Sequence, residues 1–176
     1  MNERSSDYYD PHPRVTIDKP IVLAGQIGSG APAIGRGVAA RTGLRFSEID
    51  RMVEHGAGCS LAALAASEGI AIVEERADGA LRRVVARPPF GLIVLEHAWP
   101  AGCGDVLREH AHLVNIDRPL EYLSARAESA PAWSSSDREA LLSLAHTVLD
   151  AGMQHVHSVV SLLLESLERI AGAQRL

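Results

Sequence analysis

The residues best placed to do chemistry lie in a glycine-rich turn that follows a short apolar segment. Gly25, Gly28 and Gly30 have the spacing of a phosphate-binding loop, Gly-four residues-Gly-Lys-Ser/Thr. Glycines at these positions permit a tight turn and direct backbone N–H groups inward, toward a phosphate. The last two positions of the pattern differ, because Ala31 stands in place of the lysine and Pro32 in place of the Ser/Thr.

Those two replacements remove the groups that act on a nucleotide in such a loop. Ala31 has no ammonium for the β- and γ-phosphates, and Pro32 has neither a hydroxyl for Mg²⁺ nor a backbone N–H. Lys19 is the only lysine of the chain and precedes the apolar segment, at the end far from the loop. Since a strand rises about 3.3 Å per residue, Lys19 starts beyond reach of a phosphate there. The sequence therefore predicts that ATP and Mg²⁺ binding are lost and that no cofactor is bound.

Short apolar segments alternate with stretches of helical periodicity along the chain. Four segments are predicted as strands: 20–24, 46–50, 91–95 and 112–116. The predicted helices are 32–41, 52–55, 60–67, 71–86, 105–110, 119–127, 137–150 and 154–171. Strands that alternate with helices predict a three-layer αβα fold, in which helices cover both faces of a parallel sheet.

Composition is typical of one globular domain and excludes several classes of function. The chain has 176 residues, 47% of them hydrophobic and 22% charged. A net charge of −5 without a basic run argues against a nucleic-acid partner, and no apolar segment approaches the length that spans a membrane. Cys59 and Cys103 follow no metal or redox spacing. With no signal-peptide pattern at the start, we expect free thiols and a cytoplasmic protein. Residues 1–18 are predicted as a flexible tail, and residues 19–176 as a single domain.

Several spaced features of the chain resemble shikimate kinase, a small P-loop kinase of the nucleoside-monophosphate-kinase type. The similarity runs from about Pro20 to Leu123 and includes the glycine turn, the segment 42–50 with its acidic end, and the strand at 92–95. Further landmarks of the family fall at Glu54, Gly58, Ser60 and Gly69. The resemblance implies a P-loop fold with strand order 2-3-1-4 and the first strand in the centre. The sequence leaves the family's fifth strand open, because no turn signal divides 154–171.

The positions that bind shikimate and phosphate in this family carry different residues here. By the same spacing, Glu48 replaces the first shikimate-binding aspartate, while Asp50 keeps the second. Glu74 stands where the family has the arginine that grips the substrate carboxylate, and the triple glycine becomes Glu96-His97-Ala98. Ala130-Pro131 resembles the Arg-Pro pair of the lid, without its arginine. The resemblance thus implies that a site for an anion has become acidic.

Ligands in this kind of fold bind beyond the carboxyl ends of the strands. We therefore expect Glu48, Asp50 and His97 to meet there, with Glu96 or Glu74 nearby, because neighbouring strands lie about 4.8 Å apart. Such a group could transfer protons, hold a metal ion, or bind a cationic or amine-bearing small molecule. The candidate catalytic residues are Glu48, Asp50, Glu96 and His97. The candidate ligand-binding residues are Gly25, Gly28, Gly30, Glu74 and Trp99, whose ring could stack on a flat ligand. The plain alternative is a set of solvated acids at strand ends, with Trp99 filling space.

Three functional hypotheses follow. The first is a shikimate-kinase-like protein without kinase activity, which serves as a binding module for a small molecule or a partner protein. The second is an enzyme that kept the scaffold and changed its reaction, and the third is a divergent but active small-molecule kinase. The apolar C-terminal helix, around 156–167, has room for both a core face and a homo-oligomer contact.

Overall fold

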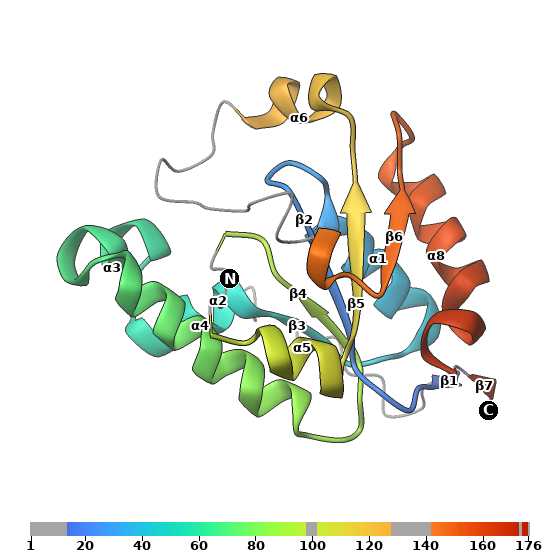
Figure 1. The fold of residues 1–176 in the computed structure, drawn as a ribbon, viewed down its shortest axis with the longest axis horizontal. Coiled ribbons are helices and arrows are strands. Elements are labelled where there is room, and N and C mark those ends of the chain that lie inside the picture. Colours follow the sequence, from blue (N-terminus) through green and yellow to red (C-terminus); the bar gives the residue numbers. More distant parts are fainter. Residues whose placement is uncertain (1–13, 98–101, 128–141, 173, 176) are drawn as a thin grey trace, which may run out of the picture.

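The computed structural model describes residues 14–97, 102–127, 142–172 and 174–175. Its centre is a sheet of five parallel strands in the order β3-β4-β2-β5-β6 (Figure 1). The strands are β2 (Ile21–Gly25), β3 (Phe46–Glu48), β4 (Leu92–Val94), β5 (His112–Asp117) and β6 (Thr147–Asp150). The predicted αβα fold and its strand order 2-3-1-4 are confirmed, with β2 in the centre.

The fifth strand, β6, corrects the prediction of a helix over 137–150. Within the described residues, 142–144 are helical and 147–150 pair in parallel with β5. The helix-forming residues before Thr147 continue into a segment whose β-branched Thr147 and Val148 favour a strand. Pairing with β5 decides between the two, and the strand ends at Asp150.

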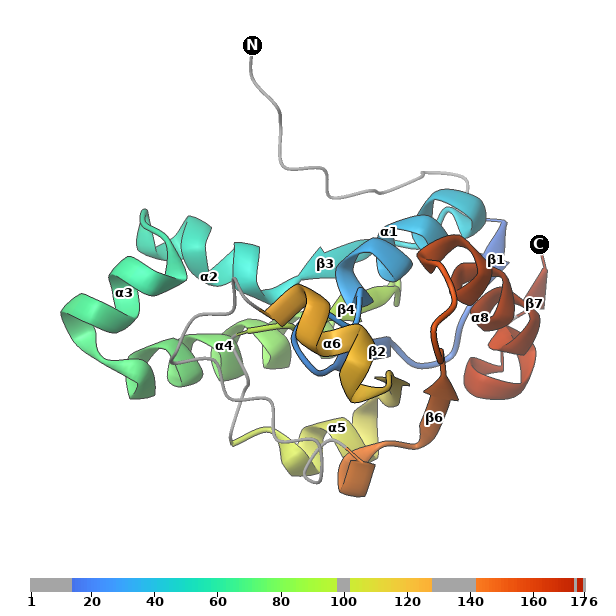
Figure 2. The same cartoon turned by 90° about the horizontal axis from the view of Figure 1, so that it is seen from above.

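Alternation along the strands divides the core into two layers (Figure 2). Ile21 and Leu23 point toward α1 (Ala31–Thr42) and α8 (Val156–Ala171). Val22 and Ala24 point to the opposite face, where α4 (Ile70–Val85) and α5 (Gly104–His110) lie. The layer on this face also includes residues of α2 (Ile49–Ala57) and α3 (Leu61–Glu68), both of which pack against α4. The helix α6 (Leu120–Ala127) follows β5 beyond the carboxyl end of the sheet.

The end of α1 and the start of α3 lie within one residue of their predicted positions. Gly43 adopts φ 73°, a left-handed conformation that glycine accepts without steric cost, and its N–H bonds Ala39 as α1 ends. Ser60 precedes α3, and its hydroxyl accepts a hydrogen bond from the backbone N–H of Ala63 at 3.2 Å. Such caps satisfy backbone groups that the helix itself leaves open.

The two termini of the described chain meet in a small antiparallel sheet of β1 (Val15–Thr16) and β7 (Gln174–Arg175). The predicted tail over 1–18 is therefore too long, because Val15 and Ile17 also pack against the core. Residues 1–13 lie outside the described part. The apolar side of α8 is buried in the domain core. A homo-oligomer through this helix stays a prediction. Among the described helices, none is long and apolar enough to cross a membrane.

Candidate functional site

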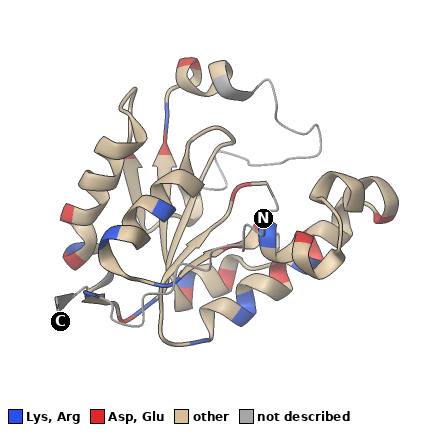
Figure 3. Ribbon diagram, turned by 180° about the vertical axis from the view of Figure 1, so that it is seen from behind, with Lys and Arg blue, Asp and Glu red and all other residues tan. Residues whose placement is uncertain are grey.

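A cleft of about 350 Å³ opens at the carboxyl end of the sheet, between α1, α2, α3 and the end of β4. Three strands have an acidic last residue at this end (Figure 3): Glu48 in β3, Asp117 in β5 and Asp150 in β6. Glu96 follows β4 closely and lines the cleft. Parallel strands align their carboxyl ends, which is why these separate segments converge on one edge.

The phosphate loop predicted from the glycines is built at the start of α1. Gly28 (φ 84°) and Gly30 (φ 87°) adopt left-handed conformations that make the turn. A side chain at Gly25 would place its Cβ 2.5 Å from the Ser29 hydroxyl, so the turn also needs glycine for space. Ala31 opens α1 and is 1% exposed, while Pro32 occupies its first turn. The loop thus has the glycine turn of a phosphate-binding loop, while Ala31 and Pro32 supply neither an ammonium nor a hydroxyl.

Arg118, which sequence reasoning missed, joins this loop to the segment after β6. Its side chain is buried, and Nε donates to the carbonyl of Ser29 at 3.2 Å. Its Nη1 donates, at 3.0, 3.0 and 2.6 Å, to the carbonyls of Ala151, Gly152 and Gln154. The guanidinium carbon lies 4.0 Å from the centroid of the Tyr122 ring. The one signal available was an arginine placed directly after an apolar strand and before a proline.

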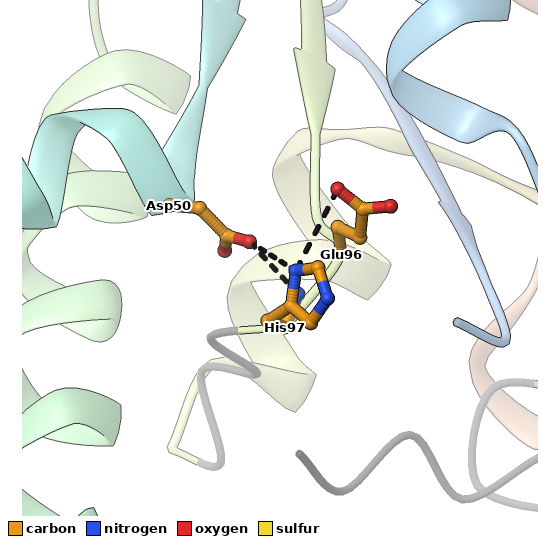
Figure 4. A group of neighbouring side chains, drawn as sticks. All are labelled: Asp50, Glu96 and His97. Atoms are coloured by element: carbon orange, nitrogen blue, oxygen red, sulfur yellow. Dashed lines mark hydrogen bonds and ion pairs between the residues drawn. The ribbon is translucent and has the colours of Figure 1, made fainter. Parts of the chain in front are cut away.

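Asp50, Glu96 and His97 converge in the cleft (Figure 4). Asp50 lies in the first turn of α2, and the other two residues follow β4, which pairs with β3. The Nδ1 of His97 is 3.0 Å from Oδ2 of Asp50 and 3.6 Å from a carboxylate oxygen of Glu96. The backbone N–H of His97 donates to the same Oδ2 of Asp50 at 3.0 Å. The start of α2 and the segment after β4 therefore hold the His97 imidazole next to the carboxylates of Asp50 and Glu96.

The electrostatics of this group follow from its burial and contacts. The hydrogen bond to Asp50 raises the pKa of His97 above its usual value; burial opposes this, and the Glu96 charge adds to it. Burial raises the pKa of Glu96, and Asp50 and Glu48 add to that effect, while His97 opposes it. Both directions follow from the closeness of the groups, because neighbouring carboxylates disfavour each other's charge and favour the proton on His97.

Glu48 lines the same cleft but does not join this group. Its carboxylate contacts the guanidinium of Arg36 and lies 2.6 Å from Nε of Arg51. Glu48 therefore lies in one cleft with Asp50 and His97, and its carboxylate pairs with two arginines there. Arg36 sits one turn into α1, a position from which its side chain returns to the carboxyl end of the sheet.

Of the remaining predicted residues, one lies in the described part of the chain and the others lie outside it. Glu74 lies half-buried on α4, which packs against α2 and α3, and is not among the side chains that line the cleft. Trp99, Ala98 and the pair Ala130-Pro131 lie outside the described residues. Glu74 is therefore not placed as a ligand to the cleft, and the role of Trp99 stays a prediction.

Both cysteines are free thiols, as predicted from their spacing. Cys59 is exposed, whereas Cys103 is buried and its thiol lies 3.8 Å from the carbonyl of Asp78. Burial raises the pKa of Cys103 to about 12, and the Asp78 side chain adds to the shift. Because the thiolate is the reactive form, Cys103 is unsuited to act as a nucleophile.

The metal-free protein is expected to lose stability as pH rises through the folded-state pKa of His97. That pKa lies above the usual 6.5, so the folded chain holds the proton more tightly than the unfolded chain. The resulting stabilisation is complete below about pH 6.5 and disappears as pH passes the raised value. Urea unfolding in the presence of a chelator measures it, as the difference between wild type and His97→Gln. A difference that stays constant with pH would contradict this assignment.

Comparison with known proteins identifies relatives of this chain. No family model matches the chain. The shikimate kinase of Oleidesulfovibrio alaskensis is 38% identical over 120 residues, which cover 65% of this chain and 67% of that protein. The shikimate kinase of Nitratidesulfovibrio vulgaris is 34% identical over 116 residues. The chain spans just under two thirds of this second relative, 64% of its length.

Solved structures show the same fold. The shikimate kinase from Acinetobacter baumannii in complex with shikimate superposes with a TM-score of 0.75 at 17% identity, over 86% of this chain and 93% of that one. The shikimate kinase from Bacteroides thetaiotaomicron gives a TM-score of 0.70 at 19% identity, over 88% and 99%. At these identities, the likeness speaks for the architecture, and the chemistry must come from the residues of this chain.

Proposed function

This chain belongs to the shikimate kinase family, and we propose that it is a member without ATP-dependent kinase activity, which binds a small molecule or a partner in its acidic cleft. The observation that carries the proposal is the phosphate loop. Its glycine turn is complete, yet Ala31 and Pro32 stand where phosphoryl transfer needs an ammonium and a hydroxyl.

Energetics support the loss of nucleotide binding. Charge-assisted hydrogen bonds contribute roughly 1.5–3 kcal/mol each, and about 1.4 kcal/mol corresponds to a tenfold change in affinity. Without the lysine contact and the hydroxyl on Mg²⁺, affinity for Mg-ATP falls by orders of magnitude. In-line transfer would also lack the charge that neutralises the transferred phosphoryl group.

The charge of the cleft favours a cationic or amine-bearing ligand. Two arginines and four carboxylates line it, which gives a net charge of −2 when all are ionised, or −1 when His97 carries its proton. These six residues are Arg36, Arg51, Glu48, Asp50, Glu54 and Glu96. Both arginines contact Glu48, whose single negative charge offsets one of their two positive charges, and the cleft as a whole stays acidic. A shikimate-like carboxylate would enter a cleft whose remaining groups repel it.

The contact between Asp50 and His97 favours a second candidate, a non-kinase enzyme on the same scaffold. In it, the Asp50 carboxylate orients the imidazole through the 3.0 Å contact with Nδ1. The other ring nitrogen, Nε2, would then accept or donate a proton at a substrate in the cleft. Glu96 could serve as a second acid, since burial raises its pKa.

Calorimetry with Mg-ATP tests the proposal directly. We expect no heat of binding at millimolar nucleotide and no phosphorylation of shikimate in a coupled assay. The control is a shikimate kinase with an intact loop, measured under the same conditions. Mg²⁺-dependent binding of ATP to this chain, or turnover of shikimate, would overturn the loss of kinase activity.

A further inference from the structure

We propose that Asp50, Glu96 and His97 bind a divalent transition metal ion of the Zn²⁺ class. The ligands are one carboxylate oxygen each from Asp50 and Glu96, and Nδ1 of His97. The remaining coordination positions face the cleft. The inference rests on the proposed function, because it names the kind of cation that the same acidic cleft takes.

Geometry carries the first step. One donor atom from each residue lies within 4.8 Å of the others. The two contacts of His97 Nδ1, 3.0 Å to Asp50 and 3.6 Å to Glu96, are edges of the triangle that the three atoms form. Zinc ligands lie about 2.0–2.2 Å from the metal, so a tetrahedral site has ligand–ligand edges of about 3.3–3.6 Å. The two edges at His97, 3.0 and 3.6 Å, lie close to that range, and donor atoms of the two carboxylates lie within 4.8 Å of each other.

The donor set selects the class of metal. An imidazole nitrogen suits zinc, copper, iron and nickel, whereas magnesium and calcium prefer oxygen ligands alone. Three protein ligands with a free position toward a cleft are typical of zinc sites that bind a substrate or water. Here the free coordination positions of the metal would face a cleft of about 350 Å³, which has room for a water molecule or a small ligand bound to the metal.

Regular structure positions the three residues. Asp50 lies in the first turn of α2, and Glu96 and His97 follow the buried strand β4 after one residue, Leu95. The backbone N–H of His97 donates to the Asp50 carboxylate and so orients a ligand, as outer contacts do in metal sites. Arg36 and Arg51 pair with Glu48, the neighbouring carboxylate of the cleft.

Metal titration on the full chain tests the inference. After treatment with a chelator, Zn²⁺ is added in a calorimeter, and Co²⁺ is followed by its visible absorption. We expect one site per chain with micromolar or tighter affinity. His97→Gln and Asp50→Asn should each weaken Zn²⁺ binding by about tenfold or more, since loss of a mere supporting contact already costs that much. The matched controls His55→Gln, exposed on α2, and Asp105→Asn, exposed on α5, should bind like wild type.

Metal-free thermal unfolding separates a lost ligand from a lost fold, because a folded variant that no longer binds Zn²⁺ has lost only the site. Zn²⁺ affinity that is equal in His97→Gln and His55→Gln, or no saturable binding in wild type, would overturn the metal site. Such a result would leave the loss of kinase activity standing. Conversely, Mg-ATP binding would overturn the proposed function without touching the Zn²⁺ result.

Discussion

Replacing Arg118 with alanine is expected to lower the free energy of unfolding by about 3–5 kcal/mol. The guanidinium is 3% exposed and donates to four carbonyls, those of Ser29 and of residues 151, 152 and 154. Removing it leaves buried and partly buried acceptors unsatisfied and opens a gap beside Tyr122, two costs that add in the same direction. The hydrogen bonds that connect the loop at 25–30 to the segment after β6 would then be lost.

Urea unfolding of two further variants isolates this effect. Arg108→Ala removes an arginine that is 58% exposed, with a single 3.4 Å ion pair to Asp105, and should change stability by less than about 0.5 kcal/mol. Arg118→Lys keeps the charge without the planar fork of donors, so it should fall between Arg118→Ala and wild type. A loss at Arg118 no larger than at Arg108 would mean that the four carbonyls find water instead.

Local sequence signals predicted most of the fold because they act over a few residues. The apolar run at 21–24, the glycines at 28 and 30 and the cap at Ser60 each specify their own segment, and the structure forms them there. The strand β6 escaped prediction because its pairing with β5, about thirty residues earlier, outweighs the helical propensity just before it. Non-local pairing is the kind of information that periodicity does not carry.

In the candidate site, contacts that follow from strand order were predictable, whereas contacts that depend on a side-chain rotamer were not. The closeness of Asp50 and His97 follows from the parallel pairing of β3 and β4, which the strand order predicts. The pairing of Glu48 with Arg36 depends on which way one long side chain turns from α1, and spacing alone does not fix a rotamer. Arg118 lies among many arginines of the sequence, and only its burial in the folded chain distinguishes it.

Restoring the missing groups of the phosphate loop should restore phosphate affinity. The double substitution Ala31→Lys and Pro32→Ser supplies an ammonium, a hydroxyl and a backbone N–H within a turn whose glycines already adopt the required conformations. If two charge-assisted contacts of roughly 1.5–3 kcal/mol return, affinity for Mg-ATP should rise by at least about a hundredfold. Calorimetry with Mg-ATP and Mg-pyrophosphate measures it, and both should gain, since the restored groups contact phosphates and not the base.

Shikimate phosphorylation should stay absent in this variant. Glu74, Glu96 and His97 still replace the groups that the family resemblance assigns to shikimate binding, and the cleft stays acidic. The matched control Ala33→Lys places the same charge on the exposed side of α1, two residues further along, and should gain no affinity. Equal gains at positions 31 and 33 would trace the effect to general charge attraction. A gain confined to the double substitution would instead assign the increase in Mg-ATP affinity to positions 31 and 32, since the glycine turn around them is unchanged.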